Sequence, residues 1–161
     1  MYSIAIHGGA GTILRSAMSA EMEKAYRQAL SEALQKGFEI LVAGGSSLDA
    51  ITSAIVSLED NILFNAGRGS VFTNRGEHEM DASVMYGADG NAGAISGVKQ
   101  IRNPILLARE VMENSQHVFL CSEGAMEFAR EKGIAMEPDE YFYSPLRFEQ
   151  WQQVKDSDDY Q

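Results

Sequence analysis

Apolar residues recur at helical spacing in the first third of the chain. From Met22 to Leu41 they return every three or four positions with polar residues between them, which predicts one amphipathic helix. Ser19 precedes this helix as a capping residue, and Gly44-Gly45 ends it. A second helix is predicted from Ser46 or Ser47, since the same spacing continues at Leu48, Ile51, Ile55 and Leu58.

Short apolar runs predict strands elsewhere, at 2–6, 69–73, 79–85, 91–98 and 117–121. Turn residues separate the middle three runs, which favours antiparallel pairing. Further helices are predicted after Asn103-Pro104, over Ser122–Lys132 and within Tyr143–Val154. This order of elements indicates an α+β layered domain over residues 1–154, followed by a polar, acidic and flexible tail at 155–161.

Runs 79–85 and 91–98 do not alternate cleanly between apolar and polar residues. A strand without such alternation is expected to be buried on both faces. The chain has too few predicted strands to cover the second face itself, so a further sheet is expected to provide that cover.

Charge and composition narrow the class of protein. The 161 residues are 45% hydrophobic and 22% charged, and 23 acidic against 13 basic residues give a net charge of −10. This balance argues against binding nucleic acid or an anionic membrane. The chain has one cysteine, no apolar run of the roughly twenty residues that span a bilayer, and no signal-peptide pattern in its first residues. It is therefore expected to be cytoplasmic.

Most common catalytic motifs are absent. The sequence contains neither a phosphate-binding GxxxxGK[ST] loop nor a GxSxG nucleophile elbow, and His7, His78 and His117 lack metal-ligand spacing. His78 is interpreted as a solvated turn residue and His117 as structural. Cys121 is interpreted as a small buried thiol. Asp81, inside an apolar strand, is expected to bond backbone amides or to face a pocket.

Two loops remain as candidate sites. The glycine loop His7–Gly11 follows a predicted strand and could aim backbone amides at a developing negative charge, although a simple tight turn explains it equally well. The loop from Leu58 to Gly69 has no helical or strand period. Its carbonyl oxygens could hold a hard cation, or they could simply be hydrated.

The segments that carry chemistry also match a known family in order and spacing. They are Ile6-His7-Gly8-Gly9-Ala10-Gly11, Gly44-Gly45-Ser46-Ser47-Leu48-Asp49-Ala50, Leu58-Glu59 with Phe64-Asn65-Ala66-Gly67, Glu79-Met80-Asp81-Ala82-Ser83-Val84-Met85, Ala92-Gly93-Ala94 and Arg102-Asn103-Pro104-Ile105. On these residues the chain resembles the α subunit of the plant-type asparaginases, or isoaspartyl peptidases, among the N-terminal-nucleophile hydrolases.

The resemblance implies a four-layer αββα sandwich that is completed by a separate β subunit, cut from the same precursor near the acidic tail. A threonine that begins the β chain would be the nucleophile, with its own α-amine as base. The implied substrates are β-aspartyl (isoaspartyl) dipeptides and L-asparagine, and the implied assembly is an (αβ)2 heterotetramer. No organic cofactor is implied.

The resemblance also assigns site residues. Asn65 falls on the family's active-site asparagine, and Gly8 and Gly9 fall on the glycine loop that borders the nucleophile. A structural sodium ion would be held by main-chain carbonyls of Leu58, Glu59, Asn61, Phe64, Ala66 and Arg68.

Other functions stay open at this point. A glycosylasparaginase or a taspase-type threonine hydrolase would share these segments. A small acidic module that binds a ligand without turnover is an alternative from a different class.

Overall fold

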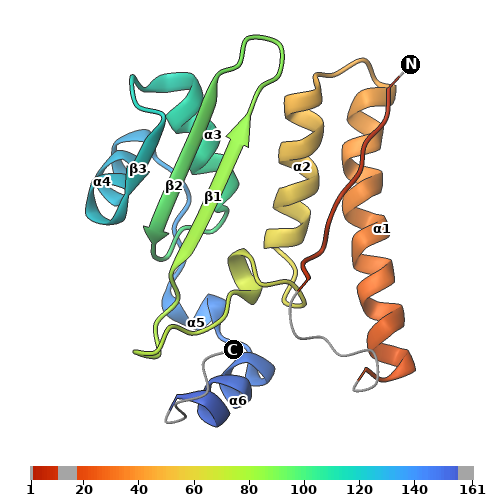
Figure 1. Ribbon diagram of the computed structural model, residues 1–161, viewed down its shortest axis with the longest axis vertical. Coiled ribbons are helices and arrows are strands. Elements are labelled where there is room, and N and C mark those ends of the chain that lie inside the picture. Colours follow the sequence, from red (N-terminus) through yellow and green to blue (C-terminus); the bar gives the residue numbers. More distant parts are fainter. Residues whose placement is uncertain (1, 11–17, 156–161) are drawn as a thin grey trace.

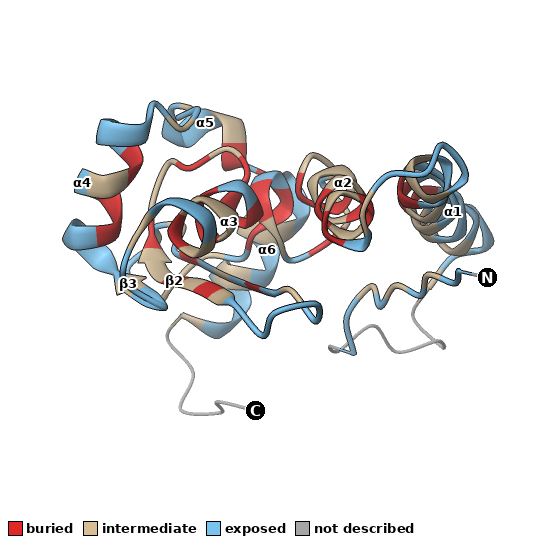
Figure 2. Ribbon diagram, turned by 90° about the horizontal axis from the view of Figure 1, so that it is seen from above, coloured by how far each residue is buried: buried red, intermediate tan, exposed pale blue. Residues whose placement is uncertain are grey.

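The computed structural model describes residues 2–10 and 18–155. Its helices are α1 (Ala20–Val42), α2 (Ser47–Glu59), α3 (Pro104–Asn114), α4 (Ser122–Lys132), α5 (Asp139–Phe142) and α6 (Pro145–Val154), with one 3₁₀ turn, η2 (Gly67–Gly69). Its strands are β1 (Met80–Met85), β2 (Ala92–Val98) and β3 (Phe119–Cys121). Helices α1, α2 and α3 lie in one layer, and the sheet and the N-terminal segment lie in the other (Figure 1, Figure 2). The α+β class is therefore confirmed.

The helix predictions are confirmed, and so are their caps. The Ser19 hydroxyl accepts from the Met22 amide at the start of α1, and the Ser46 hydroxyl accepts from the Asp49 amide at the start of α2. Pro104 occupies the first turn of α3, where its missing N–H costs no hydrogen bond. Gly133 ends α4 in the left-handed conformation, φ 68°.

The sheet is smaller than the sequence predicts. Strands β1 and β2 are antiparallel, and β3 joins β2 in parallel, in the order β1-β2-β3. The predicted strand at 69–73 is wrong: η2 occupies its start, and only one bridge, Phe72 to His78, forms. The predicted strand at 2–6 is also wrong, because this segment is extended but pairs with no described strand.

Two apolar clusters hold the layers together. The larger fills the space between the sheet, α3 and α4, and includes Ile95, Val98, Ile105, Leu107, Val111 and Ala129. Helix α3 lies directly on β2, because a Cβ built on Gly93 would come 2.1 Å from the Ala108 carbonyl oxygen. The smaller cluster joins α1 and α2 to the following loop through Ala29, Ala33, Leu58 and Phe64.

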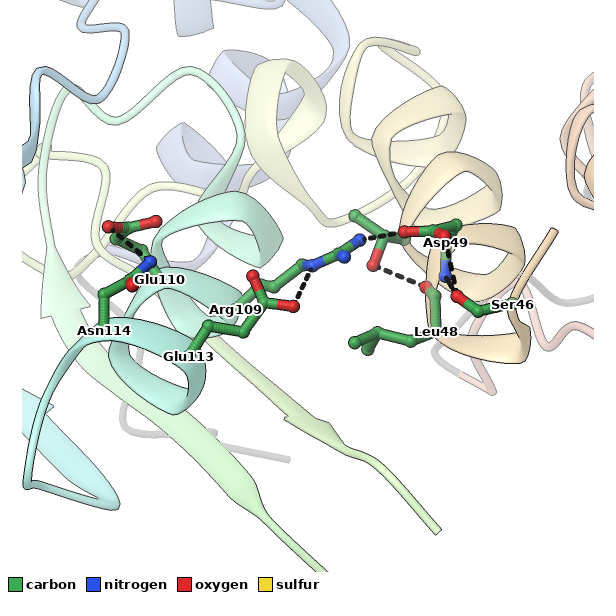
Figure 3. A network of polar contacts seen from close by, with 8 residues as sticks. Ser46, Leu48, Asp49, Arg109, Glu110, Glu113 and Asn114 are labelled. Atoms are coloured by element: carbon green, nitrogen blue, oxygen red, sulfur yellow. Dashed lines mark hydrogen bonds and ion pairs between the residues drawn. The ribbon is translucent and has the colours of Figure 1, made fainter. Parts of the chain in front are cut away.

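Polar contacts fasten α2 to α3 at both ends. Arg109 of α3 pairs with Asp49 near the start of α2 at 2.8 Å and with Glu113 one turn later at 2.9 Å (Figure 3). The Glu59 carboxyl group at the end of α2 accepts from the Ile105 amide in the first turn of α3 through Oε1. The two helices are thus antiparallel, and the loop that leaves α2 starts from a fixed point.

One face of the sheet lies open in the described chain. Residues on the helix side, such as Ile95 and Val98, are fully buried, whereas Ser83, Met85 and Phe119 are exposed. Ser83 and Phe119 both pair with Ala94, so they share this open face. The expected burial of both faces is therefore not provided by the described residues. Among the described helices, none is both long and apolar enough to cross a membrane.

Candidate active site

The loop between α2 and β1 closes tightly on its own backbone. Gly67 has a positive φ of 50°, and a Cβ built there would come 2.4 Å from the Glu59 carbonyl oxygen. A Cβ on Gly69 would come 2.2 Å from the Phe64 carbonyl oxygen and 2.7 Å from that of Ile62. Only glycine allows this approach, so the sequence Gly67-Arg68-Gly69 dictates where the loop's carbonyls lie.

Asn65 sits on the outer side of this loop with its side chain already oriented. Its Oδ1 accepts from the Val71 amide at 2.9 Å. Because a backbone N–H can only donate, the amide oxygen must face Val71, and the NH₂ group faces away as a double donor. Asn65 is exposed, so that donor can meet a substrate or a second polypeptide.

The glycine loop meets the same region from the N-terminal side. A Cβ on Gly8 would come 2.8 Å from the Leu30 side chain of α1 and 3.1 Å from the Phe64 ring. Gly9 has φ +102°, and its amide donates to Nδ1 of His7 at 3.1 Å. The fold therefore brings Gly8 beside the residue that precedes Asn65, as the predicted site requires, while the roles of Gly8, Gly9 and Asn65 stay predictions.

Glu59 is a buried acid at the base of the loop. Its side chain is 3% exposed; Oε1 accepts from the Ile105 amide at 2.9 Å, and Oε2 is buried without a hydrogen-bond partner. Burial raises the pKa of this carboxyl from 4.5 to about 8; the Ile105 amide and the Asn103 side chain oppose the shift, and the charge of Asp60 adds to it. Asn103 caps α3 only by its backbone, so Glu59 provides the side-chain acceptor there.

If the described residues bind a metal ion, its ligands are expected to be main-chain carbonyl oxygens of the loop 58–69 and not a cluster of side chains. No cluster of three His, Cys, Asp or Glu side chains that could hold a metal exists in residues 2–10 and 18–155. Within the predicted sodium set, the carbonyls of Asn61 and Ala66 each accept one backbone hydrogen bond, which leaves a second lone pair on each oxygen, whereas the Leu58 carbonyl accepts from the amides of Asp60 and Asn61. The carbonyl oxygen of Glu59 lies against Gly67, and the carbonyl oxygen of Phe64 lies against Gly69. The Asn61 and Ala66 carbonyls can therefore still bind such an ion, and the six-carbonyl site stays a prediction.

Other candidates from the sequence are explained by structure. Asp81 bonds the Gly97 amide at 2.8 Å, the first of the two roles predicted for it. The solvated turn predicted for His78 is wrong: it is half-buried, contacts the Ser70 hydroxyl at 3.1 Å and packs on Phe72. That hydroxyl belongs to a residue only 2% exposed, so this pair cannot attack a substrate. Cys121 is exposed rather than buried.

A cleft of about 810 Å³ lies elsewhere, between the ends of β1 and β2 and the starts of α4 and α5. None of the predicted site residues lines it. Its basic groups are neutralised locally, because Lys99 pairs with Glu77 and Glu79, and Arg130 pairs with Glu123. Both of these basic side chains are therefore occupied by neighbouring carboxylates, and none of the residues that the family resemblance assigns to the site lies there.

Two residues that the sequence analysis did not predict, Tyr26 and Arg147, form hydrogen bonds to the carbonyls of this loop from distant parts of the chain. The hydroxyl of Tyr26 in α1 donates to the Leu63 carbonyl at 3.0 Å. Arg147 in α6 donates to the same carbonyl and to that of Gly69, each at 3.2 Å. These contacts join residues 37 to 84 positions apart, and no local pattern encodes them.

Comparison with known proteins gives these features a context. The sequence model of the family described as Asparaginase matches residues 1–161. The isoaspartyl peptidase of Salmonella typhimurium is 51% identical over 91% of this chain and 47% of its own length. The plant-type L-asparaginase of Pyrococcus horikoshii is 44% identical over 97% of this chain and 48% of its own length. The chain thus spans about half the length of the curated relatives it matches.

Proposed function

Because this chain belongs to the asparaginase family, we propose that it is the α subunit of an autoprocessed hydrolase of β-aspartyl dipeptides and L-asparagine. The observation that carries the proposal is its strong identity to relatives named isoaspartyl peptidase, over nearly its whole length but only half of theirs. The other half would be the β subunit, in an (αβ)2 heterotetramer.

The open face of the sheet supports a partner of this kind. Met85 is 64% exposed and Phe119 is 55% exposed, and burying such apolar surface would stabilise an assembly by about 25 cal/mol per Å². The extended segment 2–9 lies in the sheet's layer without pairing to a described strand (Figure 2). Strands from a β subunit would pair with it and cover the open face, which gives the four-layer αββα sandwich.

The reaction would divide its groups between the two chains. The hydroxyl of the β chain's first threonine would attack the side-chain carbonyl of the substrate, while its own α-amine takes the proton. The tetrahedral intermediate then breaks its C–N bond: the amine or ammonia leaves with the proton returned by the α-ammonium, and an acyl-enzyme ester remains. Water attacks this ester, gives its proton to the α-amine, and releases aspartate and the threonine hydroxyl. On this chain, the Asn65 NH₂ would donate to the nucleophile or its water, and Gly8 and Gly9 would leave room for the reacting backbone.

The test of this function starts from the protein as purified, with every polypeptide that it contains. N-terminal sequencing should find a second polypeptide that begins with threonine. Release rates from β-aspartyl-leucine and asparagine should exceed the rate from a glycosylated asparagine. A single intact polypeptide with full activity would contradict the divided site, and preference for the glycosylated substrate would place the protein with the glycosylasparaginases.

The loop 58–69 would hold a structural sodium ion through the carbonyls of the predicted set. A bound cation would offset the repulsion between the carbonyl dipoles that it draws together in this short loop. We expect replacement of sodium by choline at constant ionic strength to lower the melting temperature on the order of 5 °C, since a ligand at a hundred times its dissociation constant adds about 2.7 kcal/mol. Equal melting curves in the two salts would exclude the ion.

A further inference from the structure

Arg147 forms hydrogen bonds to the loop that carries Asn65 at one residue before Asn65 and at one residue after it. Its Nη2 donates to the Leu63 carbonyl and its Nε donates to the Gly69 carbonyl, both at 3.2 Å. Leu63 precedes Asn65 by two residues and Gly69 follows it by four. A planar guanidinium is suited to such a double contact, because its donors diverge in a fixed fork.

The helix that carries Arg147 is itself anchored. The Ser144 hydroxyl caps α6, and Ser144 is 3% exposed. The rings of Phe148 and Trp151 lie 5.9 and 5.7 Å from the ring of Phe72, in the segment that follows the loop. Gln150 accepts from the remaining terminal nitrogen of Arg147, Nη1, at 3.0 Å, which fixes the guanidinium plane. The arginine is therefore a rigid support.

Arg147 and the predicted cation use different oxygens of the same loop. Leu63 and Gly69 are not among the six carbonyls of the predicted sodium set. With a cation bound, the loop's carbonyl dipoles would thus be divided between that cation and the guanidinium. Removing the guanidinium would release the Gly69 carbonyl and leave the Leu63 carbonyl bonded to the Tyr26 hydroxyl alone, without touching the cation's predicted ligands.

We propose that Arg147 is a positioning residue for Asn65: by bonding the Leu63 and Gly69 carbonyls it fixes the loop that presents the Asn65 amide. The Val71 amide is the direct reporter of this role, because it bonds Asn65 Oδ1. The kinetic consequence rests on the proposed function, whereas the consequence for the Val71 amide does not.

The test compares Arg147→Lys and Arg147→Met with the unchanged protein, purified with all its polypeptides. Lysine keeps the charge but reaches one carbonyl at a time. Hydrogen exchange of the Val71 amide at 25 °C should accelerate about tenfold in Arg147→Lys and more in Arg147→Met. The kcat for β-aspartyl-leucine should fall between about tenfold and a hundredfold, with KM within about twofold.

Arg130→Lys is the matched control, since Arg130 is exposed and pairs with Glu123 of its own helix. It should change neither Val71 exchange nor kcat. A merely structural Arg147 would lower the melting temperature in both variants and leave Val71 exchange at 25 °C unchanged, which would overturn the proposal. Faster exchange with no hydrolysis in any variant would uphold Arg147's role and count against the proposed function alone.

Discussion

Replacement of Asn65 by aspartate should lower kcat for β-aspartyl-leucine by about 10²- to 10³-fold, the usual cost of removing one positioned donor from a site of this kind. The substitution is informative because it removes the NH₂ donor of the side chain and keeps the oxygen acceptor. Aspartate keeps an oxygen for the Val71 amide, so the local bond of 2.9 Å survives. It loses the NH₂ group that faces the reaction, and the loss therefore falls on kcat.

Two further variants interpret that result. Asn65→Ala removes both ends and should be no more active than the aspartate variant. Asn114→Ala is the matched control, because Asn114 is an exposed asparagine whose side-chain amide bonds Glu110, one turn earlier in α3 (Figure 3). Its kcat should be unchanged. If Asn65→Asp retains full kcat, the donor has no part in the reaction, and Asn65 is a structural turn residue.

Local signals in the sequence predicted the helices well. Ser19, Ser46, Pro104 and Gly133 act within a few residues of themselves, so capping and propensity alone specify where α1 to α4 begin or end. Strands depend on distant partners. The segment 2–6 has a strand's composition but pairs with no described strand, and the predicted strand at 69–73 begins in a 3₁₀ turn and forms a single bridge, Phe72 to His78.

The candidate site was predicted from family motifs more than from physics. The glycines near Asn65 are visible in the sequence, but their closeness to the carbonyls of Glu59 and Phe64 appears only when the loop is folded. Arg147 lies 78 residues from Gly69, and an arginine in an amphipathic helix has many possible partners. Contacts of that range follow from the whole topology, which no local pattern contains.

Glu59→Gln should remove a pH dependence of stability that the unchanged protein shows between about pH 4.5 and 8. The pKa of this carboxyl is 4.5 in its ordinary state and about 8 in the fold, chiefly because of burial. A carboxyl with a raised pKa binds its proton more tightly when folded. Its contribution to stability is therefore complete below pH 4.5 and is lost as the pH rises to 8, with an upper limit on the loss of about 5 kcal/mol.

Glutamine reproduces the neutral acid at every pH. Its carbonyl can accept from the Ile105 amide as Oε1 does now, so the tie between α2 and α3 is kept. Free energies of unfolding in urea, measured from pH 5 to 9, should diverge in favour of Glu59→Gln as the pH rises and run parallel above pH 8. Glu32→Gln, on the exposed side of α1, controls for the loss of one charge.

Glu59→Ala separates the contact from the charge. It leaves the Ile105 amide without an acceptor and opens a cavity at the base of the loop, so the free energy of unfolding should fall by about 2–4 kcal/mol even at pH 5. Parallel pH profiles for the unchanged protein and Glu59→Gln would mean that the carboxyl is ionised in the fold. The Glu59 carboxylate would then act as a charged cap on α3, and its unpartnered Oε2 would need a cation or water to balance it.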